Sequence, residues 1–260
     1  MFNKNAHSMK KLSMVPLLMV FIFFYSCKQK DSTPPQVFLN GDNPMTDTLG
    51  TVFTDPGATA DDNFDGAGIT NKIEVTSNID YITGTPRTKT AGVYTITYSV
   101  SDKANNSTSK TRTVNIINSS AKYATTYLFD KTGDDNLFPN FVDLQTTIDY
   151  DSRVNNRIYL TKLCNKPGLR IYIDILNDSL IDIPDQYRIL TESTVEKLYR
   201  VRGEGGQSRI IDNIFFTFVV KYQVEKYDES TISDYDYEAD GRYWRSTGNY
   251  DVSTELYERL

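Results

Sequence analysis

A period of two in the spacing of apolar residues is the feature that most constrains the fold of this chain. Within residues 92–100, Tyr94, Ile96 and Tyr98 fall on one face, while Thr and Ser residues between them fall on the other. Strict alternation of this kind predicts a β-strand with one buried face. A comparable run at 111–116 follows a short turn, with no helical period between the two. Short strands at such spacing predict an all-β fold of the sandwich type.

The character of the sequence changes along its 260 residues and divides them into four parts. We expect residues 1–26 to be a signal peptide and residues 27–35 to be a polar tether. Residues 36–118, rich in Thr, Asp, Gly and Asn, form the first predicted domain. Residues 121–260 form the second and hold most of the Tyr and Phe. Alternate residues from 214 to 224 make one long apolar face there, which predicts a second β-sandwich or a flattened β-barrel.

Several separated blocks of the first predicted domain follow the order of a known family. They are residues 54–62, 66–69, 91–98, 101–102 and 112–114. On these residues the segment resembles the bacterial immunoglobulin-like domain of the pesticidal crystal protein type. The resemblance implies an immunoglobulin-like sandwich that serves as a spacer or an adhesive module and has no catalytic role.

The beginning of the chain has the parts of a bacterial lipoprotein signal. Two lysines precede an apolar run at 12–25, and Cys27 follows directly after a small residue, Ser26. The run is shorter than the roughly 20 residues that a membrane-spanning helix needs, and it matches the apolar core of a signal peptide. Resemblance to lipoprotein signals implies lipidation of Cys27 and a membrane anchor made of acyl chains. The alternative is an ordinary signal peptide with an incidental cysteine.

The tether also carries part of a sorting signal. Residues 29–31, Gln-Lys-Asp, resemble part of the signal that sends some Gram-negative lipoproteins to the outer face of the outer membrane. We therefore expect a lipid-anchored protein of the outer membrane that is displayed at the cell surface.

The scarcity of histidine and cysteine limits the chemistry available to the chain. The single histidine, His7, lies in the segment that we expect to be removed. Ser-His-Asp and Cys-His catalysis are thereby excluded for the mature protein, and zinc loses its commonest nitrogen ligand. No carboxylate pair stands out as that of a glycosidase, so we expect no enzyme activity. Cys164 has no disulfide partner once Cys27 is lipidated, and we expect it to be a buried strand residue. The net charge of −6 disfavours nucleic acid as a partner.

Residues 236–245 are the densest aromatic and charged segment and include the only tryptophan. Sugar rings present C–H faces that pack on aromatic rings, while charged side chains bind their hydroxyl groups. The sequence therefore predicts a glycan-binding surface, for which the candidate residues are Tyr237, Tyr243, Trp244 and Tyr250. The alternative is a tyrosine-rich edge strand whose rings cover the core, which is the commoner use of such residues.

A loop in the first predicted domain has oxygen ligands at alternate positions. Asp61, Asn63 and Asp65 are followed by Gly66, and this is the spacing that a hard cation such as calcium prefers. A complete calcium loop of the EF-hand type ends in Glu, whereas this chain has Lys72 at that position. The alternative is an acidic, turn-rich loop between strands.

Together these patterns predict a non-catalytic outer-membrane lipoprotein in which the immunoglobulin-like domain is a spacer. The second domain is then a glycan-binding accessory of a polysaccharide-uptake system. The alternative is a structural or adhesive module that contacts another protein of a surface complex.

Overall fold

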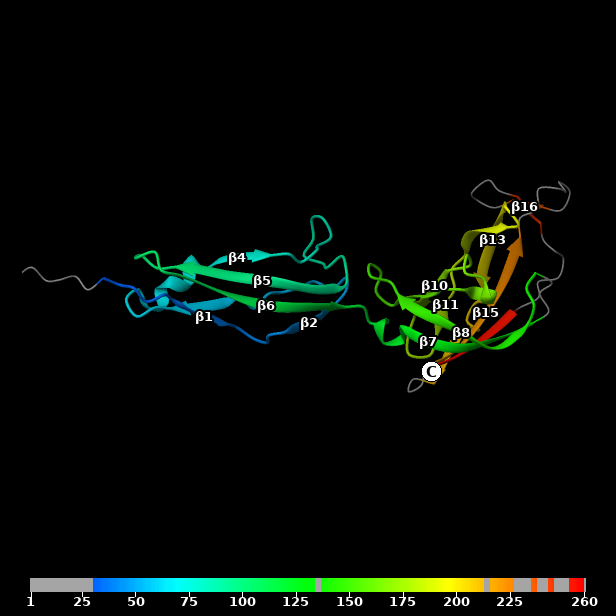
Figure 1. The fold of residues 1–260 in the computed structure, drawn as a ribbon, viewed down its shortest axis with the longest axis horizontal. Helices are drawn as coiled ribbons and strands as arrows, with labels where there is room; N and C mark the ends of the chain where they lie inside the picture. The colour runs from blue at the N-terminus through cyan, green and yellow to red at the C-terminus, as the bar shows by residue number, and fades with distance from the viewer. Residues whose placement is uncertain are drawn as a thin grey trace, which may run out of the picture.

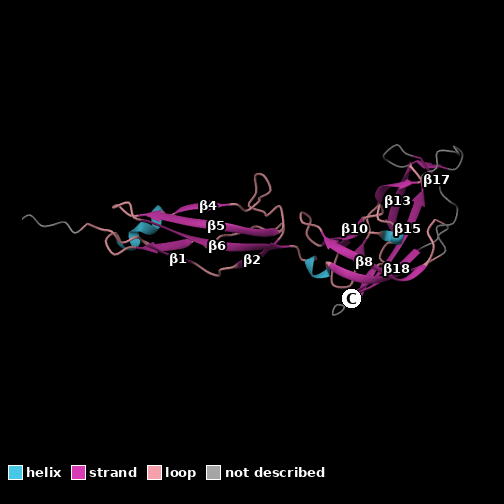
Figure 2. Ribbon diagram, viewed as in Figure 1, coloured by secondary structure: helices cyan, strands magenta, loops and turns pink. Residues whose placement is uncertain are grey.

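Two β-domains lie end to end in this protein, as Figure 1 shows. The first lies within residues 36–117 and the second within residues 121–259. Strands dominate both domains (Figure 2), which confirms the predicted all-β fold. The computed structural model describes residues 30–133, 137–212, 216–226, 235–237, 243–245 and 253–259.

The first domain is a sandwich of two small sheets. One sheet pairs β1 (Gln36–Leu39) with β3 (Ala58–Asp61) in antiparallel fashion. The other has the strand order β2 (Met45–Thr48), β6 (Ser107–Ile117), β5 (Gly92–Ser101) and β4 (Glu74–Ser77), with β2 parallel to β6. The 3-10 helix η1 (Gly66–Lys72) follows β3 and places Ile69 in the core.

The alternating pattern that predicted β5 also builds the core of the first domain. Ile96, Tyr98 and Val100 are each exposed by 3% or less, whereas the residues between them are exposed or half-buried. They pack with Val114 of β6 in one apolar cluster between the sheets. Asn105 in the turn between β5 and β6 has a φ of 67°, a left-handed conformation that Asn tolerates better than most residues. The predicted strand and its turn are thus confirmed.

A buried arginine ties the two sheets of the first domain together. Arg112 of β6 is completely buried, and its Nε donates to the hydroxyl of Tyr98 at 3.2 Å. Its Nη2 donates to the carbonyls of Asn40 and Gly57 at 2.6 and 3.0 Å, and its Nη1 donates to the carbonyl of Asp42. The guanidinium can therefore bond several loop carbonyls at once, because its five donors spread in a fixed plane.

The second domain is built on one large sheet. Its hydrogen-bonded order is β11 (Ile181–Asp182), β10 (Ile171–Ile175), β9 (Arg157–Leu160), β8 (Phe141–Tyr150), β7 (Thr125–Thr132), β18 (Ser253–Arg259), β15 (Thr217–Lys226), β13 (Val195–Gly203) and β12 (Gln186–Glu192). The short strand β14 (Arg209–Asp212) also pairs with β15. The 3-10 helices are η2 (Ala121–Tyr123) and η3 (Leu163–Asn165), and β16 (Tyr235–Tyr237) pairs with β17 (Tyr243–Arg245) in a separate hairpin. None of the helices in the described part of the chain is both long and apolar enough to cross a membrane.

This sheet curls strongly, so that segments near its two ends come within hydrogen-bonding distance; we call this shape a half-barrel. At one meeting point, the Gln186 side chain of β12 accepts from the Tyr172 N–H at 2.8 Å and donates to the Tyr172 carbonyl at 2.7 Å. At another, the N–H of Gly203 donates to the carbonyl of Ile183 at 3.0 Å. The half-barrel agrees with the predicted sandwich or flattened barrel, because a curled sheet covers both sides of its own core.

Aromatic rings fill the interior of the half-barrel. Phe218, Val220 and Tyr222 alternate along β15 and are all completely buried, as the long apolar face predicted. Phe218 meets the ring of Tyr127 edge to face at 5.8 Å between centroids, a preferred aromatic geometry. Much of the Tyr content of the second domain is therefore structural.

Cys164 is buried as predicted, but it does not lie in a strand. It belongs to η3 and has a φ of 53°, a left-handed conformation that is not that of a β-strand. Its N–H instead donates to the Glu255 carboxylate at 2.7 Å. A buried acceptor in the core, which the local pattern does not reveal, explains why the strand prediction was wrong here.

The two domains are hydrogen-bonded to each other around Asn118, which follows β6 and is buried. Its Nδ2 donates to the carbonyls of Asp151 and Val154 at 2.5 and 2.8 Å. Its Oδ1 accepts from the N–H groups of Ser120 and Asn156 at 2.8 and 3.1 Å. One asparagine thus holds both the end of the first domain and a turn of the second.

Candidate functional site

The predicted glycan-binding segment forms the hairpin of β16 and β17. Tyr237 is the register partner of Tyr243, and Trp244 is the partner of Asp236. Tyr250 lies outside the described residues, as does Cys27. Tyr237, Tyr243 and Trp244 therefore belong to one small hairpin, within seven residues of one another in the sequence.

A second surface of aromatic and charged residues lies on β9 and β10, and we call it the Arg–Tyr layer: Arg157, Tyr159, Arg170, Tyr172 and Asp174. The guanidinium carbon of Arg157 lies 3.8 Å from the Tyr172 ring centroid. That of Arg170 lies 3.6 Å from the Tyr159 ring centroid. The two rings meet edge to face, with centroids 6.5 Å apart. Flat cationic and aromatic groups thus alternate across the pair of strands, held by cation–π attraction.

Hydrogen bonds fix the Arg–Tyr layer in place. Arg157 donates from Nε and Nη2 to the two carboxylate oxygens of Asp174 at 2.7 and 2.9 Å. This bidentate bond raises the pKa of Arg157. The hydroxyl of Tyr159 donates to Asp151 at 2.8 Å. The layer is therefore a rigid polar surface that offers N–H donors and ring edges, which suits the recognition of hydroxyl or carboxylate groups.

The Arg–Tyr layer was not predicted from the sequence. Its signal is the pair of alternating runs Arg157–Tyr159 and Arg170–Tyr172–Asp174. These runs become one surface only because β9 and β10 pair with Tyr159 opposite Tyr172. The register between strands carries that information.

The interior of the half-barrel holds a buried carboxylate, Glu255 of β18. It is completely buried and accepts hydrogen bonds from the Tyr222 hydroxyl at 2.7 Å and from the Tyr257 hydroxyl. Burial raises the pKa of Glu255 to about 7, although these donors and the charge of Lys131 act to lower it. The Cys164 sulfur lies 3.1 Å from the same Tyr222 hydroxyl. This polar cluster lies in the core, where it orders the packing of β15 and β18.

The predicted calcium loop lies between β3 and η1. Asp65 forms an ion pair with Lys103, 2.6 Å from Oδ1 to Nζ, and this bond lowers the pKa of Asp65. Asp61 accepts the N–H of Asp62 at 3.0 Å. Asn63 is exposed and lines a small hollow together with Asp61. The three predicted ligands thus lie on one loop, and Asp65 already has a cationic partner.

Comparison with known proteins bears mainly on the first domain. No protein of curated function matches this sequence. Among solved structures, a lipoprotein from Bacteroides thetaiotaomicron matches with 14% identity over 87% of this chain and 100% of that chain, with a TM-score of 0.30. A family described as "Bacterial surface protein, Ig-like domain" matches residues 37–116. The first domain is therefore similar to the immunoglobulin-like domains of bacterial surface proteins.

Proposed function

We propose that the protein is a lipid-anchored surface protein whose immunoglobulin-like domain is a spacer and whose half-barrel is a glycan-binding head. The observation that carries the proposal is the placement of the two ends. The beginning of the described chain, drawn in blue and close in sequence to the predicted anchor at Cys27, lies at one end of the molecule, and the half-barrel lies at the other (Figure 1).

The spacer role follows from the path of the chain through the first domain. The tether enters at the end that holds the turn between β5 and β6, as the closeness of Asp31 to Asp102 shows. The chain leaves through β6 at the opposite end, where Asn118 joins the half-barrel. Eleven residues of β6 at about 3.3 Å each span about 35 Å. An acyl anchor at Cys27 would therefore hold the head at least that far from the membrane.

The hairpin of β16 and β17 supports the glycan-binding role of the head. Its segment combines Trp244 and three tyrosines, Tyr235, Tyr237 and Tyr243, with neighbouring charged residues. An aromatic ring provides an apolar face for a sugar ring, and charged side chains provide partners for hydroxyl groups. The Arg–Tyr layer is a second surface of the head with the same two kinds of group.

A glycan array tests this proposal. The probe is the protein from residue 28 onward, produced without the lipid and compared with its Trp244→Ala variant. We expect binding to a defined set of glycans that falls at least tenfold in the variant, since stacking on an aromatic ring accounts for roughly 1.4 kcal/mol or more. Phe64→Ala removes an aromatic residue that is 54% exposed in the first domain, and it should leave binding unchanged. Equal binding by wild type and Trp244→Ala would contradict the proposal.

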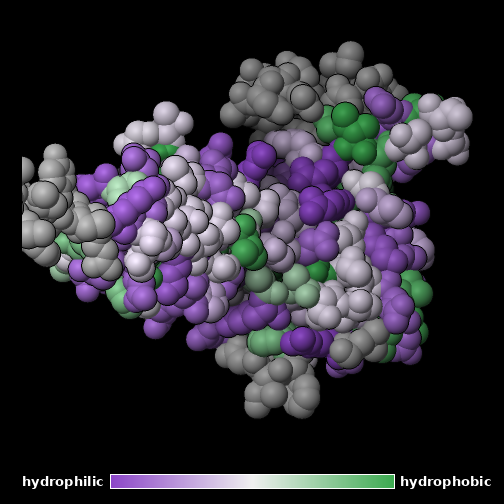
Figure 3. Space-filling view, turned by 60° about the vertical axis from the view of Figure 1, so that its left-hand side comes forward, coloured by the Kyte–Doolittle hydropathy of each residue, from purple (hydrophilic) through white to green (hydrophobic). Residues whose placement is uncertain are grey.

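One observation favours the alternative of a protein-binding module. The surface seen in Figure 3 is largely polar, with small hydrophobic patches. Near the joint between the domains, Val93, Ile117 and Tyr150 are 71%, 47% and 42% exposed and line a hollow of about 360 Å³. Exposed apolar residues around a hollow are typical of a contact with another protein. Recovery from membranes of a stable protein partner that is lost in Val93→Asp, without any dependence on sugars, would favour this alternative.

A further inference from the structure

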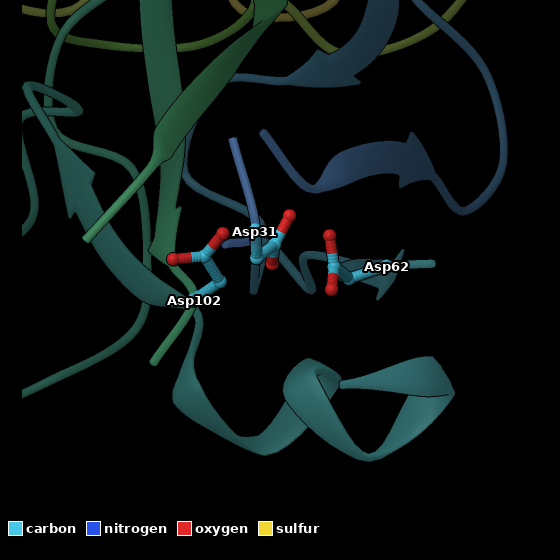
Figure 4. Close-up of side chains that lie close together, drawn as sticks. All are labelled: Asp31, Asp62 and Asp102. Carbon is cyan, nitrogen blue, oxygen red and sulfur yellow. The ribbon is translucent and has the colours of Figure 1, made fainter. Parts of the chain in front are cut away.

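We propose that Asp31, Asp62 and Asp102 form a calcium site that fastens the tether to the base of the immunoglobulin-like domain. One carboxylate oxygen of each lies within 4.8 Å of those of the other two. In Figure 4 the three carboxylates lie close together, with that of Asp31 between those of Asp62 and Asp102, and they come from three different parts of the chain. They belong to the tether, the loop after β3 and the turn after β5. Three negative charges gathered in this way repel one another, and a cation among them would relieve that repulsion.

Asp62 has an oxygen that is ready for a ligand. The residue is only 8% exposed, and its Oδ1 accepts the N–H groups of Phe64 and Asp65 at 2.9 and 2.8 Å. Its Oδ2 is buried and has no hydrogen-bond partner among the described residues. A buried carboxylate oxygen without a partner is costly, because it has lost its water and gained nothing in exchange. A metal ion held by Oδ2 removes that cost.

The other two carboxylates are held in position by their own hydrogen bonds. Asp102 is 5% exposed and accepts from the backbone N–H of Asn106 at 2.8 Å and from its Nδ2 at 2.7 Å. Asp31 accepts the N–H of Thr33 at 3.0 Å, which turns the tether toward the domain. Each carboxylate oxygen has more than one lone pair, so these bonds orient the groups and leave capacity for a cation.

The kind of ligand points to calcium. The three side chains offer oxygen only, and calcium takes six to eight oxygen ligands in a flexible geometry. A hollow of about 230 Å³ lies beside Asp62 and is lined by Thr33, Pro34, Gln36, Asp61, Asp62 and Asn63. It leaves room for the water molecules that would complete the coordination. Magnesium requires a near-ideal octahedron, for which three side chains from separate loops are less suited.

The proposed ion would link the predicted anchor to the spacer. Asp31 is four residues from Cys27. With the ion, the tether is held against two loops of the sandwich, so the domain has a defined orientation at the membrane. The inference is independent of whether the head binds glycan.

Calcium titration of the protein from residue 28 onward tests the site. We expect one calcium ion to bind, with an apparent Kd of about 10⁻⁴ to 10⁻³ M, the range of extracellular calcium modules. Asp62→Asn keeps the Oδ1 acceptor of the loop and removes the charge, so its calcium affinity should fall at least about tenfold. Asp42→Asn makes the same change of charge at an exposed position of the same domain and should bind as the wild type does.

Asp31→Asn separates metal binding from folding, because Asp31 lies in the tether before the first strand. This variant should melt at the same temperature as the chelated wild type, and calcium should no longer raise its Tm. The proposal would be overturned if the wild type bound no calcium. It would also be overturned if Asp62→Asn and Asp31→Asn bound calcium as strongly as the wild type does. Equal binding of magnesium would overturn the choice of calcium.

Discussion

The side chain of Gln186 in β12 makes the same pair of hydrogen bonds with the main chain of Tyr172 in β10 that a neighbouring strand would make. The carboxamide has a donor and an acceptor at the right separation to mimic a peptide group. Gln186 is 3% exposed, so water does not compete for these bonds. This side chain is thus one of the links between the two ends of the sheet, together with the bond from Gly203 to Ile183.

Replacing Gln186 with Ala should open this closure. We expect the free energy of unfolding of the second domain to fall by roughly 1–3 kcal/mol, because a buried N–H and a carbonyl lose their partners. Urea denaturation measures the loss. Gln145→Ala removes the same side chain from an exposed position on β8 and should change stability by less than about 0.5 kcal/mol. If the two variants are equally stable, the closure through Gln186 contributes nothing.

Replacing Arg112 with Met should destabilise the first domain by roughly 3–5 kcal/mol. The change leaves the loop carbonyls of Asn40, Asp42 and Gly57 without their cationic partner. Asp55, whose Oδ1 lies 3.5 Å from Arg112 Nε, loses it too. Hydrogen exchange of the β5 and β6 amides reports the effect in this domain alone. Arg87→Met, at an exposed position, serves as the control. Unchanged exchange in Arg112→Met would show that the buried guanidinium is replaceable by apolar packing.

The stability of the second domain should depend on pH through Glu255. Burial raises its pKa from the usual 4.5 to about 7, so the folded protein holds a proton that the unfolded chain releases between these values. The contribution of this group to stability is therefore present at low pH and is lost as the pH rises through about 7, with a slope of at most about 1.4 kcal/mol per pH unit. Glu255→Gln should abolish this component.

The measurement compares denaturation of wild type and Glu255→Gln at pH 5 and pH 8. The difference in stability between the two proteins should shift in favour of the variant at the higher pH. Glu258→Gln changes an exposed residue of the same strand and provides the control. A difference that is the same at both pH values would exclude a raised pKa for Glu255.

The proposed anchor at Cys27 can be tested by cell fractionation. Cys27→Ser should move the protein from the membrane fraction to the soluble fraction, because stable attachment depends on acyl chains. Cys164→Ser changes the other cysteine, which is buried in the half-barrel, and should leave the protein in the membrane fraction. Membrane association that survives Cys27→Ser would mean that the anchor lies elsewhere.

Local patterns in the sequence were sufficient for the elements of the first domain. The alternation in β5 and the turn at Asn105 were predicted correctly, since both depend on neighbouring residues. The blocks that carried the family resemblance include Asp55, Tyr98 and Arg112. In the structure the Tyr98 hydroxyl bonds to Asp55 at 2.5 Å and accepts from Arg112. One buried network therefore explains why these separated residues occur together.

Features that depend on contacts between distant segments were not predictable in the same way. The Arg–Tyr layer needs the register of β9 against β10, and the closure of the half-barrel needs Gln186 to reach Tyr172. The acidic cluster at the tether joins Asp31 to Asp102, which are separated in the sequence by most of the first domain. The sequence pointed to the neighbouring Asp61 and Asp65, because a spacing rule considers only residues within one loop.

The parallel pairing of β2 with β6 has a mechanical consequence. The chain reaches β2 from the end where the tether enters the first domain, whereas β6 leads directly to the second domain. Tension applied between the two ends of the molecule, as the proposed anchor and head would transmit it, therefore draws the two strands past each other along their length. The four register pairs from Met45–Val114 to Thr48–Ile117 then bear the load together, and none can open before the others. Such shear geometry lets a small sandwich resist tension along its length.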